Sequence, residues 1–171
     1  MVSSIYRPEV PGGELSRPRC GGRVGPEEIV TVHAGAISVR MSASGDRGRG
    51  RVSFAYPMAH DVRSRLAADE VVVTEPGEDR PRRYRIERLT HATAAGTWEH
   101  APPPRELTGR DLRPPRPGSP ASVFGAVASD GPLPAVFEVQ LPPAIVNGAA
   151  VEIPKVVFRQ GDAAWISPLN C

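Results

Sequence analysis

Residues 133–158 read LPAVFEVQLPPAIVNGAAVEIPKVVF, and this stretch indicates the fold class of the chain. Two apolar runs with strand chemistry flank Asn147-Gly148, the dipeptide that best tolerates the positive φ angles of a type I′ turn. The stretch therefore predicts a β-hairpin. Because Pro142-Pro143 ends the first run before the turn, we expect a short hairpin of residues 144–146 against 149–151. Any pairing between the longer arms, the apolar runs before Pro142 and after Pro154, would then span a wider connection.

The two longer arms differ in regularity. In the first arm Phe137, Val139 and Leu141 alternate with polar residues, which predicts one face on a core and one in water. In the second arm the parity of the apolar residues changes at Pro154. Since proline cannot donate to a β-ladder, we expect Pro154 at a strand edge or a bulge, where a partner could bind.

Several other segments have the same strand chemistry. Alternating or β-branched runs occupy residues 29–32, 37–42, 52–56, 70–75, 82–89 and 121–126. About eight short strands separated by Pro/Gly turns predict an all-β antiparallel β-sandwich, with a partly closed β-barrel as the alternative. The pattern resembles an immunoglobulin-like sandwich in architecture only. The antibody-type Cys…Trp…Cys core is missing, so the resemblance implies no function and no site residue.

Proline and glycine restrict the other elements. The chain has 20 prolines and 17 glycines in 171 residues, so we expect little or no helix. Residues 60–68 are the one segment where a short helix and a strand, with Val62 and Leu66 inward, both stay open. The glycine- and arginine-rich residues 44–51 predict a flexible, exposed loop between two strands.

The length fits one domain, which can bury roughly 70% of its unfolded surface. We expect residues 1–28 to be an irregular segment packed on a single domain of residues 29–171. Within that domain, we expect a Pro/Arg-rich loop at about residues 98–120. Its expected conformation is polyproline, without internal hydrogen bonds. A structureless loop of this length is uncommon and can carry function.

Cys20 and Cys171 allow two interpretations. If bridged, they would close a loop of about 150 residues, worth on the order of 5 kcal/mol. Such a bridge needs an oxidising compartment, whereas two unrelated thiols fit the cytoplasm. The first residues have neither the basic nor the apolar region of a secretory signal, and no stretch is apolar for the length of a membrane span. We favour a secreted or periplasmic protein whose leader has been removed, with a cytoplasmic protein as the alternative.

The charge excludes a strong electrostatic field. The net charge is +2, so nucleic acid is not the expected partner. Lys155 is the only lysine among 21 basic residues. Arginine suits carboxylate and phosphate recognition, yet a GC-rich genome gives the same bias without functional meaning.

Catalytic and metal-binding signatures are missing from the sequence. The four histidines do not have the spacing of a metal site, and the phosphate-binding and nucleophile-elbow motifs do not occur. We therefore expect no metal and no cofactor, and we favour a non-catalytic protein, with an enzyme left open as an alternative. His60-Asp61 is the pair that could orient an imidazole in a hydrolase with a dispersed site.

Three functions follow in order of preference. The first is a non-catalytic module for protein–protein interaction or a structural role, with Trp98 beside Pro102–Pro104, and Pro154, as candidate contacts. The second is polyanion binding, to nucleic acid or polysaccharide, through arginine-rich loops. The arginines concerned are Arg47, Arg49, Arg51, Arg105, Arg110, Arg113 and Arg116. The third is the hydrolase.

Overall fold

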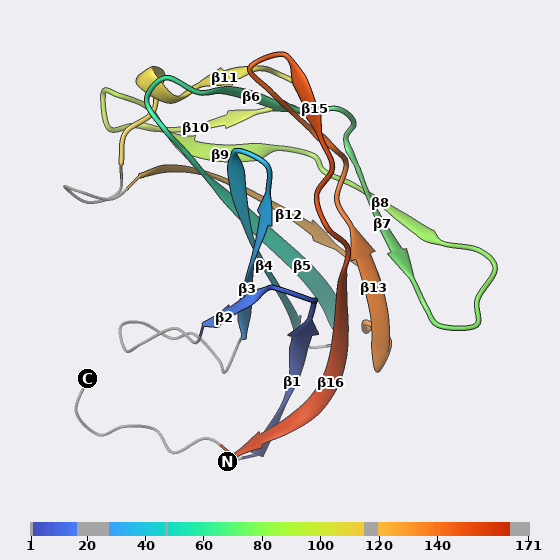
Figure 1. Cartoon of the computed structure of the whole chain (residues 1–171). Coiled ribbons are helices and arrows are strands. Elements are labelled where there is room, and N and C mark those ends of the chain that lie inside the picture. Colours follow the sequence, from blue (N-terminus) through green and yellow to red (C-terminus); the bar gives the residue numbers. More distant parts are fainter. Residues whose placement is uncertain (1, 17–27, 47, 115–119, 165–171) are drawn as a thin grey trace, which may run out of the picture.

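The computed structural model describes residues 2–16, 28–46, 48–114 and 120–164, and it shows an all-β protein (Figure 1). Sixteen strands lie in these residues, and a 3-10 turn at Gly109–Asp111 is their one helical element. The strands form three antiparallel sheets that do not close into a barrel. The predicted antiparallel, sandwich-like fold is therefore confirmed, with more strands than the sequence indicated.

The first sheet has five strands. Its order is β1 (Val2–Glu9), β16 (Val156–Ala164), β13 (Val136–Gln140), β7 (Glu70–Thr74) and β8 (Arg82–Arg85). In Figure 1, β1 and β16 lie side by side, and the β7–β8 hairpin projects from the body on the right.

The second and third sheets complete the fold. The seven-stranded sheet has the order β10 (Trp98–Ala101), β9 (Leu89–Ala92), β12 (Ala121–Ala128), β5 (Arg49–Met58), β4 (Ile37–Asp46), β3 (Ile29–Ala34) and β2 (Glu14–Ser16). The four-stranded sheet has the order β11 (Leu107–Thr108), β6 (Arg63–Leu66), β14 (Ala144–Val146) and β15 (Ala149–Val151), and it lies at the top of Figure 1.

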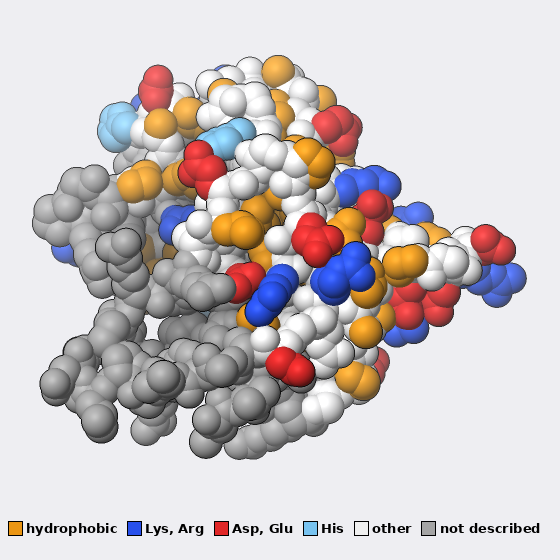
Figure 2. All heavy atoms as spheres, turned by 60° about the horizontal axis from the view of Figure 1, so that its bottom comes forward, with side chains coloured by type: hydrophobic (Ala, Val, Ile, Leu, Met, Phe, Trp, Pro, Cys, Tyr) orange, Lys and Arg blue, Asp and Glu red, His pale blue; other side chains and the backbone are white. Residues whose placement is uncertain are grey.

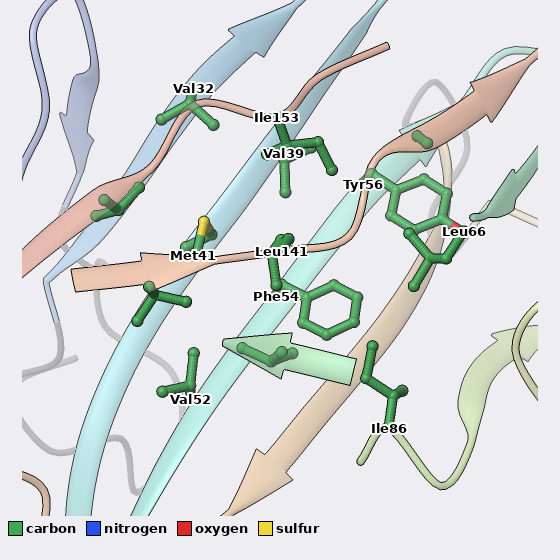
Figure 3. Close-up of a cluster of buried hydrophobic side chains, with 14 of the residues drawn as sticks. Val32, Val39, Met41, Val52, Phe54, Tyr56, Leu66, Ile86, Leu141 and Ile153 are labelled. Carbon is green, nitrogen blue, oxygen red and sulfur yellow. The ribbon is translucent and has the colours of Figure 1, made fainter. Parts of the chain in front are cut away.

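The core collects the inward residues of all three sheets. Figure 3 shows side chains from β4, β5 and β6 meeting those of the segments around Ile86, Leu141 and Ile153. At another point of the core, the Phe137 and Phe158 rings stack with centroids 5.4 Å apart, and Tyr6 meets Phe137 edge-on. All of these side chains are buried, so the alternation in the sequence marks the core correctly.

The segment 133–158 forms a short hairpin at the turn and a separate pair of longer strands, as predicted. β14 and β15 form the short hairpin, with φ of 49° at Asn147 and 86° at Gly148. The longer arms pair as β13 and β16, with Phe137 opposite Phe158. Pro154 is exposed in the connection between β15 and β16. The buried residues are odd-numbered before it (Ile153) and even-numbered after it (Val156 and Phe158). Pro154 does not lie on an open strand edge, because β16 is flanked by both β1 and β13.

The expectation of an irregular N-terminal segment was wrong for residues 2–16. β1 pairs with β16 over eight residues, and β2 pairs with β3. Pro8 is tolerated because β1 is the edge strand of its sheet, where a missing backbone donor need not break a ladder. Cys20 and Cys171 lie outside the described residues, so the bridge between them stays a prediction.

The glycine- and arginine-rich segment is not a long loop. β4 extends to Asp46 and β5 begins at Arg49, so only residues 47–48 separate the two strands. Gly50 is buried, and its N–H donates to the Gly131 carbonyl (2.9 Å) and to Ser129 Oγ (3.0 Å). Glycine at position 50 allows this close approach, which the sequence pattern alone did not indicate.

Residues 60–68 and 98–114 are also more regular than expected. The first segment contains strand β6 and no helix, with Leu66 buried. The second contains β10, β11 and the 3-10 turn, so polyproline conformation without internal hydrogen bonds was wrong there. A bridge between Thr93 and Leu112 ties this segment back to the body. Arg116 lies outside the described residues, as does Arg47. No helix in the described residues is long and apolar enough to span a membrane.

Candidate partner-binding surface

The most unusual surface feature is an exposed pair of aromatic rings. Trp98 lies on β10, the edge strand of the seven-stranded sheet, and 60% of it is exposed. Phe124 lies on β12 and is 39% exposed. The two ring centroids are 6.3 Å apart, with the ring planes tilted by 54°. The pair therefore forms a contiguous apolar surface.

The strand register explains why the two rings meet. β9 separates β10 from β12, with Ala92 opposite Trp98 and Thr90 opposite Phe124. Along β9 the side chain of His91 is buried, whereas those of Thr90 and Ala92 lie on the outer face. Because these two residues are small, the rings can approach one another over β9. We call Trp98, Phe124, Thr90 and Ala92 the aromatic patch.

The aromatic patch differs from the other aromatic positions. An isolated aromatic residue in a strand usually packs inward, and Phe54, Phe137 and Phe158 are buried accordingly. Phe124 also lies in a strand, yet part of its side chain is exposed. Three large apolar side chains are exposed in the described residues, and Leu15, the third, lies on β2 at the opposite end of the sheet.

An arginine-lined groove adjoins the aromatic patch. Its volume is about 520 Å³, and its lining includes Phe124 and Thr90. The charged residues of the lining are Arg51, Arg85, Glu87 and Arg88. We call this hollow the arginine groove. The sequence singled out Arg51, but no local signal links it to Arg85 and Arg88, because only the packing of β12 against the β8–β9 connection brings them together.

The arginine groove follows an open strand edge. β9 pairs with β12 over Val123–Gly125 only. Residues 126–128 line the groove, and on their side away from β5 the described part of the chain provides no partner strand. Backbone groups at such an edge can pair with another chain.

The other arginines named in the sequence analysis do not join this site. Arg105 lines a second hollow, Arg110 lines a third, and Arg113 contacts the turn at Gly96. Arg49 is exposed near the end of the β4–β5 hairpin. On the face seen in Figure 2, basic and acidic side chains are interspersed. The described arginines therefore do not form one continuous basic track.

The second hollow, of about 410 Å³, borders a buried histidine. His91 is 4% exposed, and its Nδ1 has no hydrogen-bond partner among the described residues. Burial lowers the pKa of His91, an effect that Glu99 opposes and that Arg105 and His100 reinforce. The imidazole is therefore neutral at pH 7. Sequence reasoning treated His91 as one of four scattered histidines, since its burial depends on its position in β9.

The third hollow contains the histidine–aspartate pair. His60 and Asp61 are both exposed and line a space of about 300 Å³ together with Arg63, Thr108 and Arg110. Among the described residues, no serine or cysteine lies in this lining beside the pair, the kind of nucleophile that a His–Asp hydrolase activates. The described part of the chain also holds no group of three residues fit to bind a metal ion.

No protein-family model, curated protein sequence or solved structure significantly matches this chain.

Proposed function

We propose that this chain is a non-catalytic binding module that docks a protein partner on the aromatic patch and the adjoining edge of β10. The contact between exposed Trp98 and exposed Phe124 carries the proposal. Tryptophan is enriched among the residues that dominate binding energy at protein interfaces. A large apolar side chain held in water on a rigid strand is a preformed anchor, because little side-chain entropy is lost when a partner covers it.

The edge position of β10 supports the same surface. β10 ends the order of its sheet, and β9 is its one neighbour among the described strands. An extended segment of a partner can add to such an edge through backbone hydrogen bonds, while side-chain pockets supply specificity. Trp98 lies in the first position of β10, so backbone pairing and an aromatic anchor are available together.

The two alternative functions have weaker support. A polyanion-binding surface needs a continuous basic track, and the described arginines lie at separate places. A hydrolase at His60 and Asp61 needs a nucleophile beside the imidazole, and their hollow offers Thr108 only.

Site-specific crosslinking tests the proposal. A photoreactive benzoylphenylalanine is placed at Trp98 in one variant and at Leu15 in a matched control, since Leu15 is equally exposed (63%) at the far end of the same sheet. We expect a discrete crosslinked species in extracts of the native host from position 98 only. Unlabelled wild-type protein should compete it away, and unlabelled Trp98→Ser should not.

The contrary result is equally clear. Identical crosslinks from positions 98 and 15, or none together with a strictly monomeric protein in light scattering, would contradict the proposal. A crosslink between two copies would identify the partner as the chain itself.

We also propose that the module is secreted or periplasmic. The all-β fold and the two cysteines support this location, since a bridge between Cys20 and Cys171 needs an oxidising compartment. Thiol labelling of protein from the native host, under denaturing and non-reducing conditions, should find no free cysteine. Two labelled thiols would contradict both the bridge and the location.

A further inference from the structure

We infer that the partner segment is acidic and runs from the aromatic patch into the arginine groove. This inference rests on the proposed function and adds the chemistry of the partner to it. The two surfaces are continuous, because Phe124 and Thr90 belong to the aromatic patch and also line the arginine groove.

The charges of the groove point to an acidic occupant. Its lining includes three arginines and one acidic residue, Glu87. Arg85 Nε already donates to Asp69 Oδ2 at 2.9 Å, whereas Arg51 and Arg88 have no acidic partner in the described residues. Arg51 Nε donates to Ser53 Oγ (3.2 Å), which steadies the side chain and leaves its other N–H groups available. Both are placed to bind carboxylates through charge-assisted hydrogen bonds.

The backbone of the groove favours an extended peptide. Residues 126–128 of β12 line it and have no partner strand on that side in the described chain. A peptide strand laid along this edge would place its side chains alternately toward the groove and away from it. Carboxylates on one face of the strand would then meet Arg51 and Arg88, while apolar residues beyond them would reach Phe124 and Trp98.

A nucleic acid fits the same surface less well. A strand with a phosphate at every nucleotide needs basic side chains along its whole path, and Glu87 and Asp69 lie beside the arginines here. The aromatic patch offers one pair of rings that contact one another, rather than a series of separate platforms for successive bases.

Defined peptides test the inference. A fluorescein-labelled peptide of alternating Glu and Val (EVEVEVE) is titrated with the full chain, and fluorescence anisotropy is measured. KVKVKVK and a labelled oligothymidylate serve as comparisons. We expect the Glu–Val peptide to bind, with an affinity that falls as salt rises, and the Lys–Val peptide not to bind. Arg51→Gln and Arg88→Gln should each weaken binding about two- to five-fold, the range for a partly exposed ion pair.

The control is Arg80→Gln. Arg80 is exposed in the β7–β8 turn without an ion pair among the described residues, and it lies outside the groove lining. This variant changes the net charge equally and should leave the affinity unchanged. An equal loss in all three variants would indicate a nonspecific charge effect and overturn the inference.

The other outcomes separate the two proposals. No binding of the Glu–Val peptide, or equal binding of the Lys–Val peptide, overturns the acidic partner. If oligothymidylate binds more tightly than the Glu–Val peptide, and Arg51→Gln and Arg88→Gln abolish that binding, a nucleic acid replaces the acidic peptide as the partner. If an Arg51→Gln/Arg88→Gln double variant still competes for the position-98 crosslink as well as wild type, the acidic partner is wrong but the binding module stands. If the position-98 crosslink itself is missing, the proposed function fails.

Discussion

The rings of Trp98 and Phe124 lie 6.3 Å apart although their strands, β10 and β12, are not neighbours in the sheet. They meet over β9 because Ala92 and Thr90, directly opposite them, are too small to separate them. The contact therefore depends on the register of three strands rather than on sequence proximity. It places an apolar side chain next to a strand edge and a groove in which Arg51 and Arg88 have no acidic partner among the described residues, the arrangement on which both proposals rest.

Buried and exposed phenylalanines should differ sharply in their contribution to stability. Phe137 is fully buried between Tyr6 and Phe158, so Phe137→Ala should lower the free energy of unfolding by about 3–5 kcal/mol through lost burial and a cavity. Phe124→Ala should cost about 1 kcal/mol, because that residue is 39% exposed and the change therefore loses less burial. Urea unfolding followed by circular dichroism measures both, and equal losses would contradict the assignment of Phe124 to the surface.

Gly50 should not accept a side chain. A Cβ at this position would come within 2.2 Å of Leu133 Cγ and 2.7 Å of Ser129 Oγ. We expect Gly50→Ala to destabilise the protein by about 1–3 kcal/mol, because the β4–β5 hairpin must move away from the 129–133 turn. Gly131→Ala is the matched control, since a Cβ there meets nothing within 4 Å. Its midpoint of urea unfolding should stay close to that of the wild type.

Asn147 combines two roles that substitutions can separate. Its φ is 49°, and its side-chain Oδ1 accepts a hydrogen bond from the Arg63 N–H at 2.9 Å. Asn147→Gly keeps the backbone conformation and loses the bond, at a cost of about 1 kcal/mol. Asn147→Ala also strains the backbone, which adds roughly 1–2 kcal/mol. Thermal unfolding should therefore rank wild type, Asn147→Gly and Asn147→Ala in falling order, and a more stable alanine variant would refute the turn assignment.

His91 should make stability depend on pH. Burial lowers the pKa of folded His91 below its ordinary value near 6.5, so below that pH the unfolded state binds more protons than the folded state. The free energy of unfolding should therefore fall as the pH drops from about 6.5 towards the lowered pKa. His91→Gln cannot titrate, so it should lose less stability than wild type between about pH 7.5 and about pH 5.5. Parallel urea titrations at both pH values test this, with His60→Gln, an exposed position, as the control.

Local chemistry was sufficient for much of the fold. The Asn147-Gly148 turn, the inward residues of β13 and the β7–β8 hairpin all follow from alternation and turn propensity within a few residues. The early strand β1 was missed because it is made by pairing with residues about 150 positions away, a partner that no local pattern reveals. The strands within residues 98–114 were missed for a related reason, since the prolines there lie between the short ladders rather than within them.

The candidate site was only partly visible in the sequence. Trp98 and Arg51 were named as contact residues, but on separate grounds and without a connection between them. Nothing in the sequence marks Phe124 as exposed, since an isolated aromatic residue in a strand usually packs inward. No sequence pattern indicated Arg88 as a contact residue. The sequence analysis also named Pro154 and several other arginines as candidate contacts. The structure places Pro154 and the described ones among these arginines elsewhere on the surface.

The sequence by itself determined an all-β, antiparallel protein, because proline and glycine exclude long helices and a period of two marks the inward residues. Only the tertiary structure decided which strands are neighbours and which edges stay open, because strand pairing joins residues far apart in the chain. That long-range register lays Trp98 against Phe124 and places Arg51 and Arg88 in one groove. The proposed partner-binding surface is therefore a product of the register.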